Sequence, residues 1–233
     1  MKYVPIFLAV AGRRCLVVGG GEVAARKVAT LLAAGAEVCV VSPHLNGALT
    51  TLASRGRIRH VAREYASGDL DGASLIYAAT DDAELHRRMH DEAGARGIPI
   101  NVADAPELCS FIVPAVLNQG ALQIAVSTAG ASPAMAKRIV ARLGRIFGSE
   151  YGLALEVMRA ARGHLKAAEP DLRIRARKLS LLAASRIPEY LRNNDLDAVE
   201  RMLHRHLGVG LDALGLSTIR GRVGADAESH TAR

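Results

Sequence analysis

The sequence predicts an α/β fold in which a doubly wound parallel sheet is followed by a small β-containing segment and a helical C-terminal domain. Two observations carry this prediction. Short continuous apolar stretches alternate with helical patterns through the first hundred residues, as in a parallel sheet that is covered on both faces. After residue 150 only helical patterns remain.

The first part contains five expected strands. They are expected at residues 14–18, 37–41, 57–61, 75–79 and 98–102. Helices are expected at residues 22–34, 45–55 and 82–95, and a glycine closes each of them. Thr80, Asp81 and Asp82 supply N-cap candidates for the last of these helices.

The pattern changes after Val102, where a hairpin and then helices are expected. Asn118, Gln119 and Gly120 are expected to join the two strands of the hairpin. Ser132 as N-cap and Pro133 at the first helical position begin the next helix. Further helices are expected at residues 153–166, 170–184, 188–193 and 195–207. A hairpin with one helix is too small to fold alone, so this segment predicts a homodimer.

Composition and charge restrict the classes of function. Residues 1–130 carry 12 Lys or Arg and 12 Asp or Glu, whereas residues 131–233 carry 18 and 11, so the net charge of +7 lies in the second part. This part is either a solvated basic surface or one that attracts an acidic partner. The chain has only 3 Phe, 5 Tyr and no Trp, so few aromatic side chains are present on which nucleic-acid bases could stack. A nucleic-acid partner is therefore not expected.

Nothing in the sequence indicates export or membrane insertion. No apolar run reaches the roughly 18–20 residues that span a bilayer. The N-terminus lacks a charged region and a cleavage site of the kind found in signal peptides. Cys15, Cys39 and Cys109 form neither a disulfide framework nor a zinc motif. We therefore expect a cytoplasmic protein with no membrane partner.

A glycine turn follows the first strand. Gly19, Gly20 and Gly21 begin the pattern G-x-G-x-x-A, which ends at Ala24 and opens the first helix. In a Rossmann-type fold the first glycine permits a tight turn, the second lets a pyrophosphate approach the backbone, and a small third residue lets helix and strand pack. The turn therefore predicts a dinucleotide site; the alternative is a turn used only for close packing.

The second strand ends in Ser42, Pro43 and His44, where an acidic residue usually holds the ribose hydroxyls. We expect the Ser42 hydroxyl to take this role, with a contribution from His44. Arginine, which would bind a 2′-phosphate, does not occur there, so the predicted cofactor is NAD rather than NADP. Thr80, which follows the fourth strand, is a further expected cofactor contact, because the carboxyl ends of the strands meet at one edge of the sheet.

Asp104 follows the fifth strand in "NVADAPELCSF". It is either a general base beside the nicotinamide or a turn-capping residue before Ala-Pro. Cys109 in the same loop is read as a packing residue rather than a metal ligand. His86 and His90 share a helix face that looks solvent-exposed, but they lack an obvious third ligand, so no stable metal site is expected.

Several segments together resemble one family. "PIF", "CLVVGGGEVAARKV", "AATDDAELH", "NVADAPELCSFIVPA" and "AVSTAGASPAMAKRI" are similar to the precorrin-2 dehydrogenase / sirohydrochlorin ferrochelatase family, which includes the N-terminal module of siroheme synthases. The similarity covers residues 3–145 and extends more loosely into the helical region. It implies oxidation of precorrin-2 to sirohydrochlorin with NAD as hydride acceptor, followed in some members by ferrous iron insertion to give siroheme.

The resemblance also implies roles for individual residues. The family's catalytic aspartate falls on Asp104, where ferrous iron would bind only transiently during chelation. Its cofactor contacts fall on Glu22, Val23, Pro43 and His44.

The substrate of the family carries eight carboxylates, and this agrees with the basic second part of the chain. Hydroxyl and cationic side chains suit its acidic arms, and the expected contacts are Ser110, Thr128, Ser132 and Arg138. Arg138 can equally be a solvated surface residue. In some siroheme synthases a serine in this loop is phosphorylated; the aligned residue here is Thr128, which departs from that pattern.

The expected domains follow from these assignments. We expect an NAD-binding Rossmann domain at residues 1–112, a dimerisation and substrate-contact segment at 113–149, a helical domain at 150–219 and a disordered tail at 220–233. The alternative function is a Rossmann module that senses NAD and does no chemistry. Loss of turnover with retained NAD binding on removal of the Asp104 carboxylate would separate the two.

Overall fold

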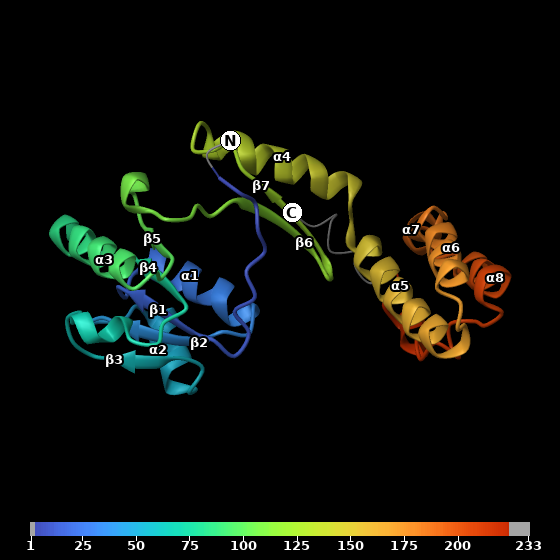
Figure 1. Cartoon of the computed structure of the whole chain (residues 1–233), viewed down its shortest axis with the longest axis horizontal. Coiled ribbons are helices and arrows are strands. Elements are labelled where there is room, and N and C mark those ends of the chain that lie inside the picture. The colour runs from blue at the N-terminus through green and yellow to red at the C-terminus, as the bar shows by residue number, and fades with distance from the viewer. Residues whose placement is uncertain (1–2, 224–233) are drawn as a thin grey trace. The chain divides into compact units, whose positions relative to one another are not determined.

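The computed structural model describes residues 3–223, which fall into two compact units that divide between Val113 and Pro114 (Figure 1). The first unit confirms the predicted doubly wound sheet. Its five parallel strands lie in the order β3-β2-β1-β4-β5. Their bounds are β1 Arg14–Val18, β2 Glu37–Val41, β3 Arg59–Val61, β4 Leu75–Ala78 and β5 Ile100–Val102.

Helices cover both faces of this sheet. The helices are α1 Glu22–Ala33, α2 Gly47–Ser54 and α3 Ala83–Ala95, with 3-10 turns at Ser67–Leu70 and Pro106–Leu108. Alternate residues of β1 point to opposite faces: Cys15 and Val17 pack with α1 and α2, whereas Leu16 and Val18 pack with α3. Asp82 caps α3 as predicted, because its carboxylate accepts the N–H groups of Glu84 and Leu85.

Two strands begin later than predicted, for one physical reason. The Arg57 N–H donates to the Leu52 carbonyl oxygen at 2.9 Å, and the Ile98 N–H donates to that of Ala93 at the same distance. Both bonds close the C-terminus of the preceding helix around a glycine with positive φ. The residues after each glycine therefore still belong to the helix ending, and β3 and β5 begin at Arg59 and Ile100.

The second unit begins with an antiparallel hairpin, β6 Ala115–Gln119 and β7 Leu122–Val126. Gln119 pairs with Leu122, so the turn consists of Gly120 and Ala121. The prediction that Asn118 and Gln119 form the turn is therefore wrong. The pairing moves the turn to the position where Gly120 adopts a φ of 60°, which suits glycine.

Helix α4 Pro133–Ile146 packs against this hairpin, and up to residue 223 four more α-helices and a 3-10 turn at Ser217–Gly221 follow it. Ser132 caps α4 as predicted, with Oγ accepting the Met135 N–H at 3.2 Å. The remaining helices are α5 Ser149–Ala168, α6 Leu172–Ala183, α7 Ile187–Arg192 and α8 Leu196–Leu207. They enclose a separate apolar core of buried residues such as Val157, Val199 and Leu203.

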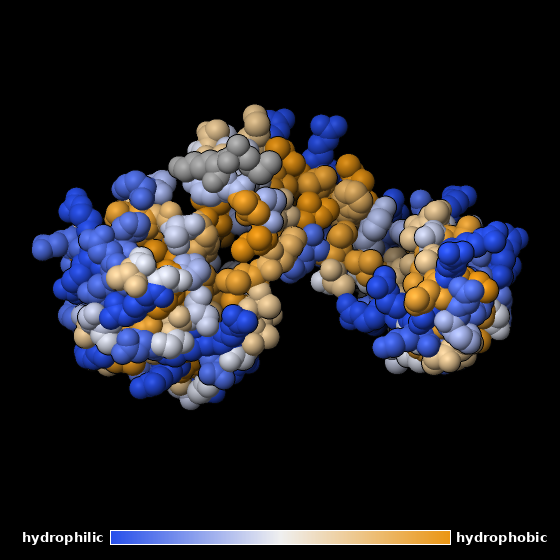
Figure 2. Space-filling view, viewed as in Figure 1, coloured by the Kyte–Doolittle hydropathy of each residue, from blue (hydrophilic) through white to orange (hydrophobic). Residues whose placement is uncertain are grey.

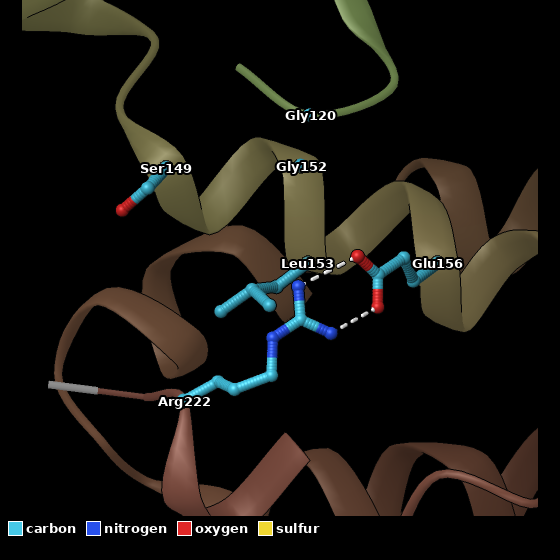
Figure 3. A pocket seen from close by; sticks show the side chains of 6 residues that line it. All are labelled: Gly120, Ser149, Gly152, Leu153, Glu156 and Arg222. Atoms are coloured by element: carbon cyan, nitrogen blue, oxygen red, sulfur yellow. Dashed lines mark hydrogen bonds and ion pairs between the residues drawn. The ribbon is translucent and has the colours of Figure 1, made fainter. Parts of the chain in front are cut away.

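The hairpin turn lies directly against α5 (Figure 3). A Cβ atom on Gly152 would lie 2.7 Å from the Gln119 carbonyl oxygen, so only glycine permits this contact. Helix α5 begins at Ser149, four residues earlier than predicted. The Glu150 side chain, which accepts the N–H of Gly148 and the guanidinium of Arg192, stabilises this early start.

The end of the described chain is packed, in contrast to the disordered tail expected from residue 220. Val223 is buried in the helical core, and the Arg222 guanidinium donates to both carboxylate oxygens of Glu156 at 2.7 and 2.8 Å (Figure 3). Arg220 pairs with Glu200 at 3.2 Å. The rest of the expected tail, residues 224–233, lies outside the described residues.

Among residues 3–223, no helix is long and apolar enough to cross a membrane. The expected boundary near residue 150 and the role of each domain stay predictions.

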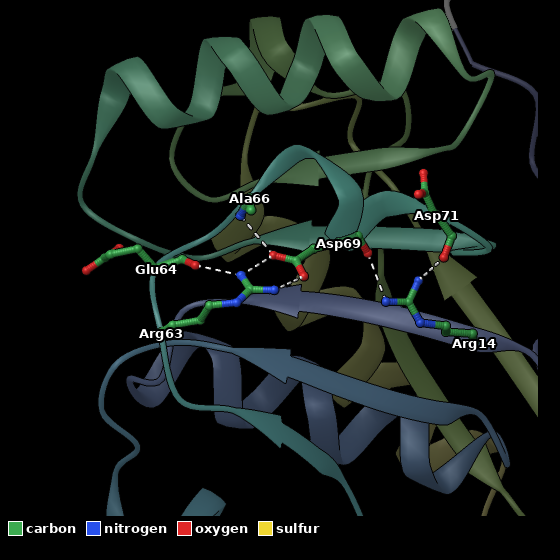
Figure 4. A network of polar contacts seen from close by, with 6 residues as sticks. All are labelled: Arg14, Arg63, Glu64, Ala66, Asp69 and Asp71. Atoms are coloured by element: carbon green, nitrogen blue, oxygen red, sulfur yellow. Dashed lines mark hydrogen bonds and ion pairs between the residues drawn. The ribbon is translucent and has the colours of Figure 1, made fainter.

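A polar network holds the connection between β3 and β4 in place (Figure 4). The Arg63 guanidinium donates to both carboxylate oxygens of Asp69 at 2.7 Å, and the Ala66 N–H donates to the same carboxylate at 2.8 Å. Arg14 donates to the carbonyl oxygens of Asp69 and Asp71. The Arg63 guanidinium, together with the Ala66 N–H, holds the pKa of Asp69 below its usual value.

This network predicts a loss of stability in acid. A carboxyl whose pKa is lower in the folded than in the unfolded state stabilises the fold above the unfolded pKa, and this contribution is lost as pH falls through the folded pKa. We expect Asp69→Asn to lower the melting temperature at pH 7 by roughly 2–4 °C and to flatten its decrease below about pH 4. Thermal unfolding between pH 2 and 7 measures this, with the exposed Glu64→Gln as the matched control. An equally steep acid dependence in Asp69→Asn would contradict it.

Candidate functional site

The glycine turn makes close backbone contacts with two neighbouring loops, and these contacts require glycine. Gly19 has a φ of 118°, and a Cβ atom there would lie 2.1 Å from the Ala79 carbonyl oxygen. A Cβ atom on Gly20 would lie 1.8 Å from the His44 carbonyl oxygen. The Asn46 N–H donates to the Gly20 carbonyl oxygen at 2.8 Å. The first two glycines thus fix the turn against the loops that follow β4 and β2.

Gly21 has a different environment and meets the requirement for an approaching phosphate. It is exposed, and a Cβ atom there would meet nothing within 4 Å. It is also the N-cap of α1, which begins without a side-chain cap, so the first turn keeps its N–H groups for an anion. The Glu22 carboxylate accepts the side-chain amide of Asn46 at 2.8 Å, and Val23 is half-buried. The residues present therefore fit the pyrophosphate of a dinucleotide.

The loop after β2 is shaped by Ser42. Its side chain is buried, and its hydroxyl donates to the His44 carbonyl oxygen at 2.8 Å. The hydroxyl proton is therefore used inside the loop, and toward a ribose Ser42 keeps only acceptor capacity. Pro43 and His44 are exposed at the same edge of the sheet, as the predicted cofactor contacts require.

The residues after β4 include a hydrogen-bonded pair that the sequence did not reveal. Thr80 Oγ1 and His86 Nε2 share a hydrogen bond of 3.0 Å, and His86 is only 6% exposed. The Thr80 Cγ2 atom would lie 3.4 Å from a Cβ atom on Gly19, so this hydroxyl is held beside the glycine turn. The expectation that His86 lies on a solvent face is wrong, because α3 turns this face toward the sheet. His90 bonds instead to the Leu108 carbonyl oxygen at 2.9 Å.

Asp104 lies exposed in the loop that follows β5. Its φ of 57° is left-handed, a conformation that aspartate tolerates better than most residues. The Ala103 N–H anchors the loop to β4 by donating to the Ala78 carbonyl oxygen at 2.8 Å. Asp104 therefore follows β5 at the same edge of the sheet as the glycine turn after β1 and Thr80 after β4.

Cys109 closes this loop from the inside. Its Sγ accepts the Val102 N–H at 3.2 Å and the Asn101 side-chain amide at 3.4 Å. Sγ also lies 3.3 Å from the carbonyl oxygens of Val102 and Ala105, one on each side of Asp104. The prediction of a packing role is compatible with this geometry, and no group of three or more His, Cys, Asp or Glu within residues 3–223 could hold a metal.

The four predicted substrate contacts are found in both units. In the first unit, Ser110 Oγ accepts the Ile100 N–H at 2.8 Å and so fastens the loop to β5. In the second, Thr128 Oγ1 bonds to both the N–H and the carbonyl oxygen of Ser132. Arg138 is exposed on α4 and has no ion pair among the described residues. That these residues gather around one substrate stays a prediction.

Two surface hollows lie elsewhere. A small one of about 120 Å³ in the second unit lies between the hairpin turn, α5 and Arg222 (Figure 3). A second of about 620 Å³ lies between Tyr65 and the start of α3. Their lining residues include no predicted site residue. The predicted cofactor contacts and Asp104 instead follow strands of the five-stranded sheet at its carboxyl edge.

Two models of known protein families match parts of this chain. The model described as NAD(P)-binding matches residues 6–115, and the model of the sirohaem biosynthesis protein central region matches residues 119–145. The two matches adjoin where the described structure divides into its two units.

Three curated relatives are named siroheme synthase. That of Thioalkalivibrio sulfidiphilus is 39% identical over 212 residues, which are 91% of this chain and 43% of the relative. That of Pseudomonas aeruginosa is 40% identical over 211 residues, 91% of this chain and 45% of the relative. That of Methylobacillus flagellatus is 49% identical over 152 residues, which are 65% of this chain and 32% of the relative. The chain thus spans less than half the length of these relatives.

A solved structure shares the fold. The chain titled "SirC, precorrin-2 dehydrogenase" superposes with a TM-score of 0.67 at 24% identity, covering 80% of this chain and 92% of that one. The sheet, the strand pair and the helical region therefore belong to a fold that is known from another protein.

Proposed function

Since this chain belongs to the sirohaem biosynthesis family, we propose that it oxidises precorrin-2 to sirohydrochlorin with NAD as the hydride acceptor. The single observation that carries the proposal is the geometry of the sheet edge. Gly21 is open to a pyrophosphate, and Asp104 follows the strand next but one to β1 at the same edge. A cofactor site and an exposed carboxylate at one edge are what a dehydrogenase needs.

The residues of the chain then act as follows. When NAD is bound, its nicotinamide supplies the hydride-accepting chemistry. The first turn of α1 would bind the pyrophosphate through backbone N–H groups, and Thr80, bonded to His86, would contact the cofactor beside it. Asp104 accepts the proton that the substrate loses, so the hydride and the proton leave by separate routes and the oxidation balances.

The β2 edge favours NAD over NADP. Neither Lys nor Arg occurs among residues 42–44 to bind a 2′-phosphate, and the buried Ser42 carbonyl and hydroxyl are already bonded within the sheet edge. We expect NAD to bind at least about tenfold more tightly than NADP, because a phosphate without a cationic partner is poorly compensated. Titration with NADH and NADPH, followed by fluorescence, measures this ratio; equal affinities would contradict the assignment.

Iron insertion into sirohydrochlorin would use the same carboxylate. Ferrous iron, a substrate here, displaces two N–H protons from the macrocycle, and we propose that Asp104 receives one of them while the other passes to solvent. Adding ferrous ion to the product of the dehydrogenation reaction tests this second step. The rate of iron insertion should then exceed the rate measured without protein.

A homodimer built on the second unit completes the proposal. Val116 on β6 and Met135, Ile139 and Ile146 on α4 are exposed, and Figure 2 shows hydrophobic side chains gathered over this segment. A second copy would cover them, because an isolated two-stranded sheet is rarely stable. Sedimentation velocity of the chain measures its mass. We place the dimer in the cytoplasm, in contact with precorrin-2 and with no nucleic acid.

The test of the proposed function is turnover by this chain alone. Incubation with precorrin-2 and NAD should produce the absorbance of sirohydrochlorin. Tight NAD binding without any product would favour the alternative, a module that senses NAD and does no chemistry.

A further inference from the structure

Lys27 is a half-buried cation on α1 that faces the sheet. Its Nζ lies 5.0 Å from the centroid of the Tyr77 ring on β4. Within residues 3–223 no carboxylate forms an ion pair or hydrogen bond with it. By contrast, Arg63 and Arg192 each meet a carboxylate within 3 Å.

An ammonium ion in this position carries an electrostatic cost. Burial, and to a smaller extent the neighbouring Arg26, lowers the pKa of Lys27. The face of the Tyr77 ring compensates for part of the lost hydration, but it supplies no negative charge. A half-buried cation without an anion is costly, and an arriving carboxylate would relieve that cost.

Lys27 lies beside the loop that carries Asp104. Phe111 ends the segment that carries Asp104, and its carbonyl oxygen accepts the side-chain amide of Asn101 on β5 at 3.1 Å. Tyr77 is the last residue but one of β4, and its ring meets that of Phe111 edge to face at 5.7 Å. The ammonium group over the Tyr77 ring is therefore near the carboxyl end of β4, the strand that neighbours β5 and the Asp104 loop.

We propose that Lys27 binds a carboxylate arm of the tetrapyrrole substrate and so helps to orient it toward Asp104. The inference rests on the proposed function for the identity of the substrate. A lysine ammonium is a compact charge with three donors, and it suits a flexible acidic arm. The Tyr77 ring fixes the direction of the lysine stem, so the charge is placed before the substrate arrives.

Lys27→Met tests the proposal, because methionine keeps an unbranched apolar stem over Tyr77 and removes the charge. We expect the KM for precorrin-2 to rise by about tenfold or more, while the Kd for NAD and the melting temperature stay as in the unmodified protein. Lys27→Arg should recover part of the loss. Arg26→Gln is the matched control, since it removes an exposed cation from the adjacent position of the same helix; its KM should stay within about twofold.

Three results would overturn the proposal. An unchanged KM in Lys27→Met would show that no arm binds there. An equal loss of NAD affinity would make Lys27 a cofactor contact. A lower melting temperature with an unchanged KM would make it a structural residue. If the unmodified chain does not oxidise precorrin-2, the proposed function is wrong. The affinity of the unmodified chain and of Lys27→Met for the octacarboxylate sirohydrochlorin, measured by fluorescence, still decides the role of Lys27.

Discussion

Asp104→Asn should lower the turnover of precorrin-2 by about 10²–10⁴-fold and leave the Kd for NAD unchanged. The amide keeps the shape of the side chain, and asparagine tolerates the left-handed φ of 57° as well as aspartate does. The substitution therefore removes the proton acceptor without straining the loop that Cys109 holds. Steady-state kinetics with precorrin-2 and a separate NADH titration measure the two effects.

Glu107→Gln is the matched control for this loss. Glu107 is an exposed acid in the 3-10 turn that follows Asp104, and removing its charge should change turnover by less than about twofold. Turnover by Asp104→Asn at the rate of the unmodified protein would exclude Asp104 as the base. Loss of NAD binding in the same variant would place its role in the cofactor site instead.

Of two alanine substitutions in the glycine turn, one should destabilise the fold and the other should leave it intact. Gly20→Ala places a Cβ atom 1.8 Å from the His44 carbonyl oxygen, and only a backbone shift can relieve this contact. We expect the free energy of unfolding to fall by about 1–3 kcal/mol and cofactor binding to be lost with the turn geometry. Gly21→Ala should fold normally, because its φ of −88° and ψ of −167° suit alanine and its Cβ would meet open space.

Gly21→Ala should nevertheless weaken NAD binding by at least about tenfold, since the new methyl group occupies the side from which the pyrophosphate approaches. Chemical denaturation and NADH titration of both variants separate the two effects. Binding by Gly21→Ala that equals that of the unmodified protein would show that the pyrophosphate does not reach this backbone position.

The sequence predicted the sheet well because its strands are continuous apolar runs. The expected bounds of β1 and β2 coincide with the observed ones, since both strands are buried on both faces and glycines lie close to their ends. The hairpin turn was expected at residues 118–120 but lies at Gly120 and Ala121, because register depends on which residues pair across the strands. The start of α5 was misplaced because Glu150 and Gly152 make contacts with distant segments.

Less of the candidate site could be predicted, for a similar reason. The glycine turn and Asp104 carry local signals, a motif and a position after a strand. Three other features depend on tertiary contacts that no local pattern records. They are the bond between Thr80 and His86, the bonds of the Cys109 thiol across its loop, and the position of Lys27 over Tyr77 without a carboxylate among residues 3–223. His86 shows the limit plainly, because arginines beside it in the sequence suggested a solvent face although its side chain is buried.

The central claim is tested most directly by counting products. This chain, supplied only with precorrin-2 and NAD, should form NADH and sirohydrochlorin in equal amounts, as followed by their absorbance during anaerobic turnover. NAD that binds while neither product appears above the rate without protein would contradict the account.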